Sequence, residues 1–227
     1  MAATIGPDFP RASERLLGRL RGMPTSLLSD AMNRMNSMSS SIKPLATGVH
    51  MIGQAVTVQA MVGCNLMSHV AIYKSRPGDV IVFDARAHLE TSVWGYLQTR
   101  ASMLRKLNGV VIDGSVRDSN EIRKSRFPVF CRGVTPAGPH KGWGDNLNVP
   151  IQCGQVCVHP GDIIVGDDDG VVVIPFIQLE EVTSSAEHRK KTEAAWFDQV
   201  AAGASTIEAV GLQERIKELG LEGILDV

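Results

Sequence analysis

Residues 79–84, Asp-Val-Ile-Val-Phe-Asp, and residues 110–113, Val-Val-Ile-Asp, decide the fold expected for this chain. Each is an apolar run of strand length, and apolar residues recur at helical spacing between them, over about 92–107. Two buried strands joined by one helix form a parallel strand–helix–strand unit. Ligands bind at the carboxyl ends of the strands in such units, so we expect a site in the loops after Asp84 and Asp113.

Outside this unit the chain alternates between helical and strand-like patterns. Two short helices are expected within 12–35, broken around 22–24, with Thr25 or Ser26 capping the second. A polar loop is expected at 85–91, and further strands at 53–60, 128–131, 149–153, 156–158, 162–165 and 170–174. A long helix at about 179–202 and a helical arm at 205–227 complete the pattern. The sequence therefore predicts one α/β domain over 1–227, flanked by helices at about 10–36 and 179–227.

Composition narrows the kinds of partner that this chain can have. Its 227 residues carry a formal net charge of -1, with Lys and Arg spread along the chain, which argues against nucleic acid and anionic membranes as partners. The sequence has no leader-like segment and no apolar run of membrane length, so we expect a cytoplasmic protein. The four cysteines lack zinc-site spacing and are expected to be reduced thiols. A small molecule or another protein is the expected partner.

The first candidate site lies where the central helix starts, near Gly95. A glycine at a helix start lets a ligand approach the backbone closely, and the N–H groups of Tyr96, Leu97 and Gln98 have no acceptor inside the helix. Such groups favour a carboxylate or a phosphate. The same groups are also typical of an ordinary helix terminus that binds only water.

The second candidate site is the sequence Gly-Ser-Val-Arg-Asp at 114–118, directly after the second buried strand. Arg117 offers a planar fork that can grip a carboxylate at two points, and Asp118 can hold a hard divalent cation. An adjacent Arg-Asp pair is also common in solvated turns, but its place at a strand's carboxyl end favours a site. Mg²⁺ often uses one or two carboxylates and several waters, so a larger ligand cluster is not required.

Two further features have simpler explanations. Residues 166–170, Gly-Asp-Asp-Asp-Gly, lack the spaced acidic ligands of a calcium loop and lie between two β-type runs, so a hairpin turn is expected. The six histidines show no paired metal-ligand spacing. His88, in the polar loop before the first candidate site, and His140, in the Gly/Pro-rich stretch 133–144, are candidate acid–base groups.

Several motifs taken together resemble one protein family. They are Leu-Ser-Asp-Ala at 28–31, Pro-Gly-Asp-Val at 77–80, Trp-Gly at 94–95, Gly-Val-Val-Ile-Asp-Gly-Ser-Val-Arg-Asp at 109–118, Phe-Pro-Val-Phe at 127–130, Arg-Gly at 132–133, Pro-Gly-Asp at 160–162 and Gly-Asp-Asp-Asp-Gly at 166–170. Through most of its length the chain resembles the class II pyruvate aldolases that cleave 4-hydroxy-4-methyl-2-oxoglutarate and 4-carboxy-4-hydroxy-2-oxoadipate. These aldolases belong to the RraA-like superfamily, which also contains the RraA-type regulators of ribonuclease E.

The resemblance implies a swivelling β/β/α fold, assembled as a homotrimer or a homohexamer with active sites between neighbouring subunits. It also implies that Gly95 and the helix-start amides of Leu97 and Gln98 bind the substrate carboxylate. Arg117 helps to bind that carboxylate in the family's site.

The resemblance further implies a metal site. Asp118 corresponds to the family's aspartate that holds Mg²⁺ or Mn²⁺ through a largely hydrated shell. A glutamate from the neighbouring subunit's C-terminal helix completes that site, and we expect Glu193 in this role, with Glu187 as the alternative. A 2-oxo acid polarised there can lose its C3–C4 bond and leave a pyruvate enolate, whose charge the metal and Arg117 stabilise.

The chain departs from the family pattern at Tyr96, because the aldolases carry Asp or Glu directly after the site glycine. The preceding segment has Arg86, His88 and Glu90 where many members have glycines. Either His88, Glu90 or Tyr96 itself serves as the acid–base group for a different 2-oxo acid, or the aldolase activity is lost while the ligand site remains.

We therefore predict a divalent-metal-dependent carbon–carbon lyase that acts on a small 2-oxo acid and releases pyruvate, with oxaloacetate decarboxylation as an accompanying reaction. The alternative is a regulatory protein of the RraA type, which needs no metal and presents a protein-binding surface. Asp118, together with Glu121 three residues later, favours the enzyme. A methyltransferase is not supported, because no Gly-rich motif opens a Rossmann unit.

Overall fold

The computed structural model describes residues 3–143, 145–221 and 223. The chain divides into two compact units, residues 1–183 and residues 184–227. The first unit contains the central sheet and both candidate sites. Helix α6 (Leu179–Ala201) starts in the first unit and ends in the second, which also contains α7 (Thr206–Val210) and α8 (Gln213–Glu218). The expectation that the whole chain is one domain stays a prediction.

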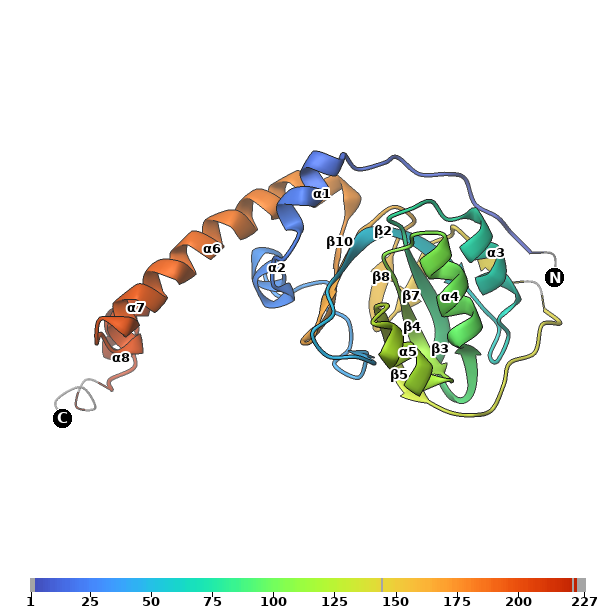
Figure 1. Ribbon diagram of the computed structural model, residues 1–227. Coiled ribbons are helices and arrows are strands. Elements are labelled where there is room, and N and C mark those ends of the chain that lie inside the picture. The colour runs from blue at the N-terminus through green and yellow to red at the C-terminus, as the bar shows by residue number, and fades with distance from the viewer. Residues whose placement is uncertain (1–2, 144, 222, 224–227) are drawn as a thin grey trace. The chain divides into compact units, whose positions relative to one another are not determined.

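An eight-stranded mixed sheet lies at the centre of the first unit (Figure 1). Its order is β1-β5-β4-β3-β2-β9-β10, β6 pairs with β2, and β7 and β8 form a separate hairpin. The strands β2, β3, β4 and β5 are parallel neighbours. The bounds are β1 Lys43–Pro44, β2 Met51–Gln59, β3 Val80–Trp94, β4 Gly109–Val116, β5 Val129–Val134, β6 Asn146–Leu147, β7 Ile151–Cys153, β8 Val156–Val158, β9 Ile163–Asp167 and β10 Gly170–Ile174.

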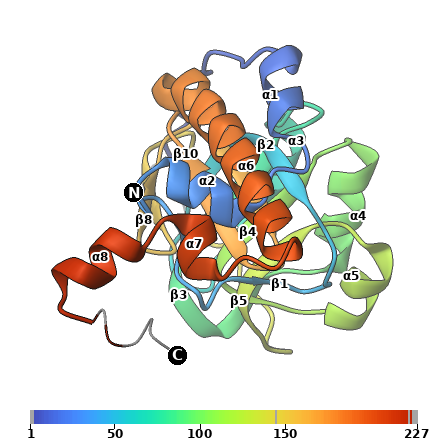
Figure 2. The ribbon, with the colours of Figure 1, turned by 90° about the vertical axis from the view of Figure 1, so that its left-hand side faces the viewer.

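Both faces of the parallel strands are covered. Helices α3 (Leu66–Lys74), α4 (Tyr96–Leu104) and α5 (Ser119–Ser125) lie on one side, and β7 and β8 lie on the other (Figures 1 and 2). Side chains alternate along a strand, so Ile81 and Phe83 pack in the core cluster of the helical side. Val80 and Val82 pack in the cluster that includes β7 and β8. Burial on both faces explains the continuous apolar runs, and the predicted mixed α/β fold is confirmed.

The predicted polar loop at 85–91 is wrong in part, because β3 runs through it and ends only at Trp94. Pairing between β3 and β4 jumps from Phe83 to His88, and its register shifts twice more before the strands end at Trp94 and Val116. Arg86 and Ala87 adopt left-handed φ angles of 57° and 55°, so the chain bulges out of the ladder and then returns to it. The following helix consequently starts at Tyr96, not at about residue 92, and ends at Leu104.

The two predicted N-terminal helices are confirmed as α1 (Glu14–Leu20) and α2 (Thr25–Ala31). The predicted cap of α2 is wrong, because Pro24 occupies the cap position and its side chain cannot accept a hydrogen bond from the first turn. The carboxylate of Asp167 takes over this task from outside the helix. It accepts hydrogen bonds from the backbone N–H of Thr25 at 2.8 Å and from its hydroxyl at 2.6 Å. A distant carboxylate thus satisfies the first turn of α2.

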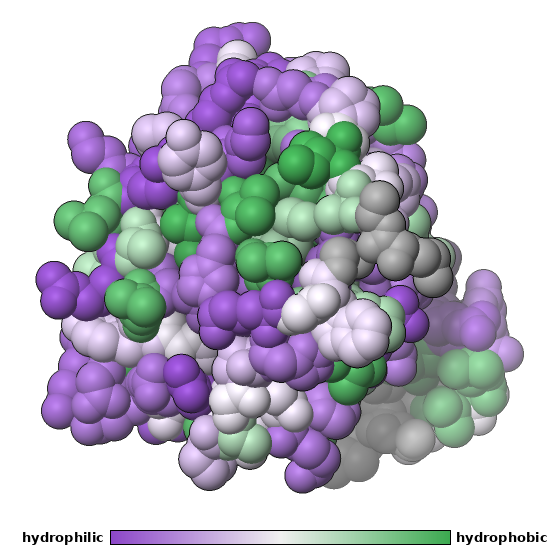
Figure 3. Space-filling view, turned by 90° about the vertical axis from the view of Figure 1, so that its right-hand side faces the viewer, coloured by the Kyte–Doolittle hydropathy of each residue, from purple (hydrophilic) through white to green (hydrophobic). Residues whose placement is uncertain are grey.

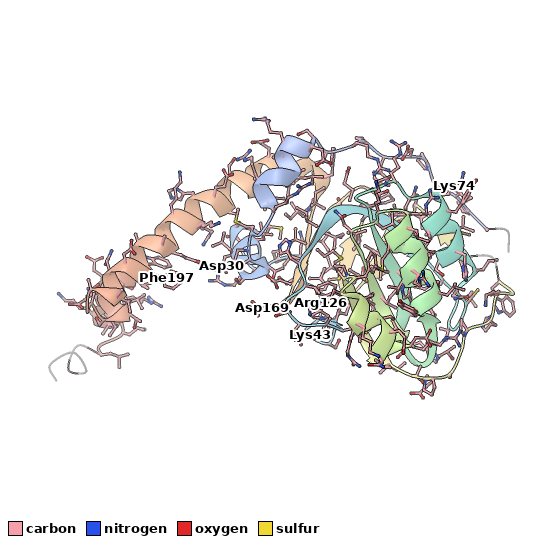
Figure 4. All side chains as sticks on the ribbon, viewed as in Figure 1. Asp30, Lys43, Lys74, Arg126, Asp169 and Phe197 are labelled. Carbon is pink, nitrogen blue, oxygen red and sulfur yellow. The ribbon has the colours of Figure 1, made fainter. Side chains whose placement is uncertain are left out.

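The acidic stretch 166–170 forms the predicted hairpin turn between the antiparallel strands β9 and β10. Its carboxylates are engaged by the protein: Asp167 accepts from Thr25, and Asp168 accepts from the N–H of Gly48 at 2.7 and 2.9 Å. The ammonium of Lys43 donates to the carbonyl of Asp169, and Figure 4 shows these two residues close together. The acidic turn therefore serves the fold.

The C-terminal predictions are confirmed in outline. The long helix expected at 179–202 is η1 (Phe176–Gln178) followed by α6. The helical arm expected at 205–227 is two short helices, α7 and α8, with residues 222 and 224–227 outside the described part. Within the described residues, no helix combines the length and the apolar character that crossing a membrane requires.

Candidate active site

The candidate active site lies where β3 and β4 end side by side. Trp94, the last residue of β3, pairs with Val116, the last residue of β4. The N–H of Arg117 then donates to the carbonyl of Trp94 at 2.9 Å. Gly95 and Arg117 therefore leave the sheet as neighbours, at the edge where parallel sheets of this kind bind ligands. The two strands end at Trp94 and Val116, so the expectation that they end at Asp84 and Asp113 is wrong.

Gly95 is the cap residue of α4, and the position has no room for a side chain. A Cβ atom there would lie 2.7 Å from Oδ2 of Asp118 and 3.3 Å from Cγ of Arg117. The same Oδ2 accepts a hydrogen bond from the N–H of Tyr96 at 3.0 Å. The glycine thus lets the carboxylate of Asp118 reach the positive end of α4.

The first turn of α4 retains hydrogen-bonding capacity. The N–H of Gly95 donates to Oε1 of its own helix's Gln98 at 3.1 Å, and the N–H of Tyr96 is taken by Asp118. The N–H groups of Leu97 and Gln98 make no hydrogen bond to another described residue. These two amides are therefore the donors left for a carboxylate.

Arg117 and Asp118 form a loose pair. Their side chains are 46% and 45% exposed, and Nε of Arg117 lies 4.0 Å from Oδ2 of Asp118. Asp118 adopts a left-handed φ of 57° at the cap position of α5, which turns the chain sharply after β4. A pair this open to solvent contributes little to stability, typically ~0–1 kcal/mol, so both groups remain available to a ligand.

Residues 135–140, within the Gly/Pro-rich stretch 133–144, cross this edge of the sheet. The N–H of Thr135 donates to Val116 O, and the N–H and hydroxyl of Ser92 both donate to Ala137 O, at 2.9 and 2.6 Å. Gly138 faces Arg117 so closely that a Cβ there would lie 2.8 Å from Nη1. The segment therefore walls the guanidinium of Arg117.

The candidate acid–base groups lie at different places. Tyr96, at the start of α4, is partly buried and packs against the core of the helical side. His88 lies in the irregular middle of β3, where its Nε2 is 3.4 Å from Oγ1 of Thr91. Glu90 is exposed on the same segment. Of the three, Tyr96 contacts Asp118, and it does so through its backbone N–H.

The 135–140 segment continues to the other candidate histidine. The N–H of His140 donates to Gly63 O at 3.0 Å, and the N–H of Asn65 donates to His140 O at 3.2 Å. A Cβ at Gly63 would lie 3.4 Å from Nε2 of His140 and from Cγ2 of Thr91. Thr91 thus lies near both His140 and His88. Figure 3 shows one face of the molecule, on which apolar and hydrophilic groups alternate.

A second Arg-Asp pair lies within the sheet and joins β4 to β5. Arg132 of β5 pairs with Asp113 of β4, whose other oxygen accepts from the N–H of Gly154 at 2.7 Å. Asp84, also buried, has its pKa raised by burial, and the nearby charge of Asp113 raises it further. Burial likewise holds the pKa of the Cys153 thiol well above its usual value. This cluster is enclosed and satisfied, unlike Arg117 and Asp118.

The donor set suits a hard, largely hydrated cation. No group of three or more His, Cys, Asp or Glu side chains placed to hold a metal ion occurs in the described part of the chain. Asp118 offers one half-exposed carboxylate, which is enough for Mg²⁺ or Mn²⁺ that keeps several waters. Glu193 is partly buried on α6 in the second unit, and its role in a neighbouring subunit's site stays a prediction.

Comparison with known proteins places the chain in a family. The RraA-like family, described as Aldolase/RraA, matches residues 25–173. The chain belongs to the RraA-like family. An RraA-like protein of Halalkalibacterium halodurans, which bears the name "Putative 4-hydroxy-4-methyl-2-oxoglutarate aldolase", is 40% identical over 177 residues, 78% of this chain and 84% of that protein. The family resemblance predicted from the motifs is therefore confirmed.

Solved RraA-like structures share the fold. An uncharacterized protein from Pseudomonas syringae pv. tomato matches with a TM-score of 0.78 at 25% identity, over 88% of this chain and 99% of its own. Streptomyces coelicolor RraAS2, described as an unusual member of the RNase ES inhibitor RraA protein family, matches with a TM-score of 0.72 at 27% identity, over 82% of this chain and 97% of its own. The RraA-like fold is thus compatible with an aldolase name and with an inhibitor name.

Proposed function

We propose that this RraA-like protein is a divalent-metal-dependent carbon–carbon lyase that cleaves a 4-hydroxy-2-oxo acid and releases pyruvate. The observation that carries the proposal is the meeting of Arg117, Asp118 and the first turn of α4 around Gly95. Donors that can bind a substrate carboxylate therefore lie beside the Asp118 carboxylate, which can bind a cation. The aldolase name of the relative from Halalkalibacterium halodurans supports the same reaction class.

The residues of the site divide the work of binding. The substrate's C1 carboxylate binds to the free N–H groups of Leu97 and Gln98 and to the guanidinium of Arg117. Each of these groups is a hydrogen-bond donor suited to a negatively charged acceptor. Asp118, with Glu193 from a neighbouring subunit, would hold Mg²⁺ or Mn²⁺. The bound cation would supply Lewis acidity that stabilises negative charge on the 2-oxo oxygen.

The two reactions of such a site differ in their need for a base. Retro-aldol cleavage breaks the C3–C4 bond only when a base removes the C4 hydroxyl proton, whereas decarboxylation of oxaloacetate releases CO₂ and needs only later protonation at C3. Tyr96 stands where the aldolases carry an acid, so aldol cleavage depends on His88, Glu90 or Tyr96. We infer that oxaloacetate decarboxylation is the less affected activity.

The assembly we propose is a homotrimer or a homohexamer, with each site completed by the neighbouring subunit's α6. Its test is the molar mass in solution by light scattering, together with the activity of Glu193→Gln and Glu187→Gln. Loss of activity in Glu193→Gln alone supports the assignment. A monomer with full activity contradicts it.

A regulatory, protein-binding role is the second candidate, because the fold also matches Streptomyces coelicolor RraAS2. Such a role does not depend on a metal or on Asp118.

One assay separates the two candidates. Pyruvate release is followed from oxaloacetate and from 4-hydroxy-4-methyl-2-oxoglutarate, with Mg²⁺ or Mn²⁺ and then with EDTA. The lyase proposal predicts that the wild type releases pyruvate, that EDTA abolishes this release, and that Asp118→Ala releases none. A protein inactive toward both substrates with either metal contradicts the proposal, and a Tyr96→Asp variant that gains aldol cleavage identifies the missing acid as the limit.

A further inference from the structure

The side chain of Gln98 lies beneath the carboxylate site and not in it. It is 5% exposed, and its Oε1 accepts the N–H of Gly95 at 3.1 Å. Its Nε2 points the other way and donates to Oγ of Ser68 at 2.5 Å. Gln98 therefore links the cap of α4 to a neighbouring helix, while its backbone N–H remains for a ligand.

Ser68, fully buried on α3, fixes which way the Gln98 amide points. Its hydroxyl donates to the carbonyl of Asn65 at 2.7 Å, so its lone pairs must accept from an amide NH₂ group. A reversed Gln98 amide would set an oxygen against this lone pair and an NH₂ group against the N–H of Gly95. The Ser68 hydroxyl, with the more distant carbonyl of Val93 at 3.5 Å, thus favours the orientation in which Gln98 caps Gly95.

The other side of Gly95 is held as well. Its carbonyl accepts from the hydroxyl of Thr99 at 3.2 Å, and that hydroxyl accepts from the indole N–H of Trp94 at 3.0 Å. Trp94, at the end of β3, and Thr99 thus hold the Gly95 carbonyl, while Gln98 holds the Gly95 N–H. Ser68 is the member of this arrangement that comes from another helix, α3.

We propose that Ser68 is a positioning residue for the carboxylate site. Through Gln98 it holds the Gly95 peptide and the first turn of α4, so that the N–H groups of Leu97 and Gln98 stay aimed at the ligand. This inference rests on the proposed function, because it assumes that the first turn of α4 binds the substrate carboxylate. Buried, fully connected polar groups of this kind rigidify the structure that they join.

The test is the affinity for oxalate, a planar dicarboxylate that resembles the pyruvate enolate, measured by calorimetry in the presence of Mn²⁺. Ser68→Ala removes the hydroxyl and should weaken oxalate binding about three- to tenfold, the range of one net hydrogen bond. Ser102→Ala is the matched control, since Ser102 is buried on α4 and its hydroxyl has no partner among the described residues. It should change the affinity less than about twofold.

A second titration separates positioning from general damage. The affinity for Mn²⁺ alone should stay within about twofold in Ser68→Ala, because Asp118 is not part of the Ser68 contacts. If Ser68→Ala does not fold, Gln98→Met removes the side-chain hydrogen bonds to Gly95, Ser68 and Val93 at similar volume and carries the test, with the same expected loss of oxalate affinity.

The outcomes distinguish this inference from the function on which it rests. Unchanged oxalate affinity in Ser68→Ala, or an equal loss in Ser102→Ala, overturns the positioning role while the wild type still binds. A wild type that binds neither Mn²⁺ nor oxalate overturns the proposed function itself.

Discussion

Two Arg-Asp pairs involve the same strand, β4, and they show how one pair of residue types serves two purposes. Asp113 lies inside β4, is buried, and is satisfied by Arg132 and by the N–H of Gly154. Asp118 follows the end of β4, is 45% exposed, and lies 4.0 Å from the Arg117 side chain. The enclosed pair has no capacity left for a ligand, whereas the open pair has. Position along a strand therefore separates a structural pair from a candidate active site.

The largest expected effect concerns the enclosed pair. Arg132→Met leaves the Asp113 carboxylate buried without its partner, so the free energy of unfolding should fall by ~3–5 kcal/mol. Arg117→Met is the matched variant in the open pair and should cost less than ~1 kcal/mol. Urea denaturation of both variants measures the difference. Equal losses would show that burial does not distinguish the two pairs.

The second effect concerns activity in place of stability. Asp118→Asn should lower pyruvate release by at least about a hundredfold, since it removes the charge that holds the cation at the reacting oxygen. Its unfolding free energy should stay within ~1 kcal/mol of the wild type. Asp30→Asn, in an exposed ion pair on α2, is the control and should keep full activity. An Asp118→Asn variant that keeps its activity but loses stability would show that Asp118 serves the fold and not the reaction.

The third effect tests the wall around Arg117. Gly138→Ala places a Cβ 2.8 Å from Nη1, so the guanidinium must move and oxalate affinity should fall about tenfold. Gly142→Ala, in the same stretch, has open space at its Cβ position and should be neutral. Calorimetry on the two alanine variants makes this comparison. Equal affinities would mean that Arg117 does not need this wall.

The smallest effect is a pH dependence of stability. Burial, aided by the charge of Asp113, raises the folded-state pKa of Asp84 above its unfolded value. The folded state therefore binds the proton more tightly, and this group's contribution to stability falls as pH rises from the unfolded pKa through the folded pKa. Asp84→Asn should remove that fall, so the variant gains relative to the wild type at pH 8 compared with pH 4. Denaturation at both pH values checks the sign.

The sequence predicted the mixed α/β fold and the strands of the parallel sheet because their apolar runs are buried on both faces. It missed α3 because that helix has apolar side chains on several sides, among them the buried Met67 and the exposed Tyr73, and no clear stripe. It placed the end of β3 too early, because the bulge at Arg86 and Ala87 interrupts the pattern while the strand continues. Local pattern does not reveal a strand that resumes after a bulge.

The candidate site was predicted in part. Gly95, Arg117 and Asp118 carry recognisable chemistry at strand and helix ends, so sequence was enough to find them. Gly138 and Ser68 carry no such signal, because their importance comes from contacts with residues distant in the chain. The buried role of the Gln98 side chain also depends on α3, which the sequence did not show.

Diffraction from crystals soaked with Mn²⁺ and oxalate, recorded to locate manganese by its anomalous scattering, tests the central claim most directly. The account predicts a manganese peak beside the carboxylate of Asp118, with oxalate against Arg117 and the N–H groups of Leu97 and Gln98. A manganese peak elsewhere, with Asp118 hydrogen-bonded only to the N–H of Tyr96 and no oxalate at the first turn of α4, would contradict this account.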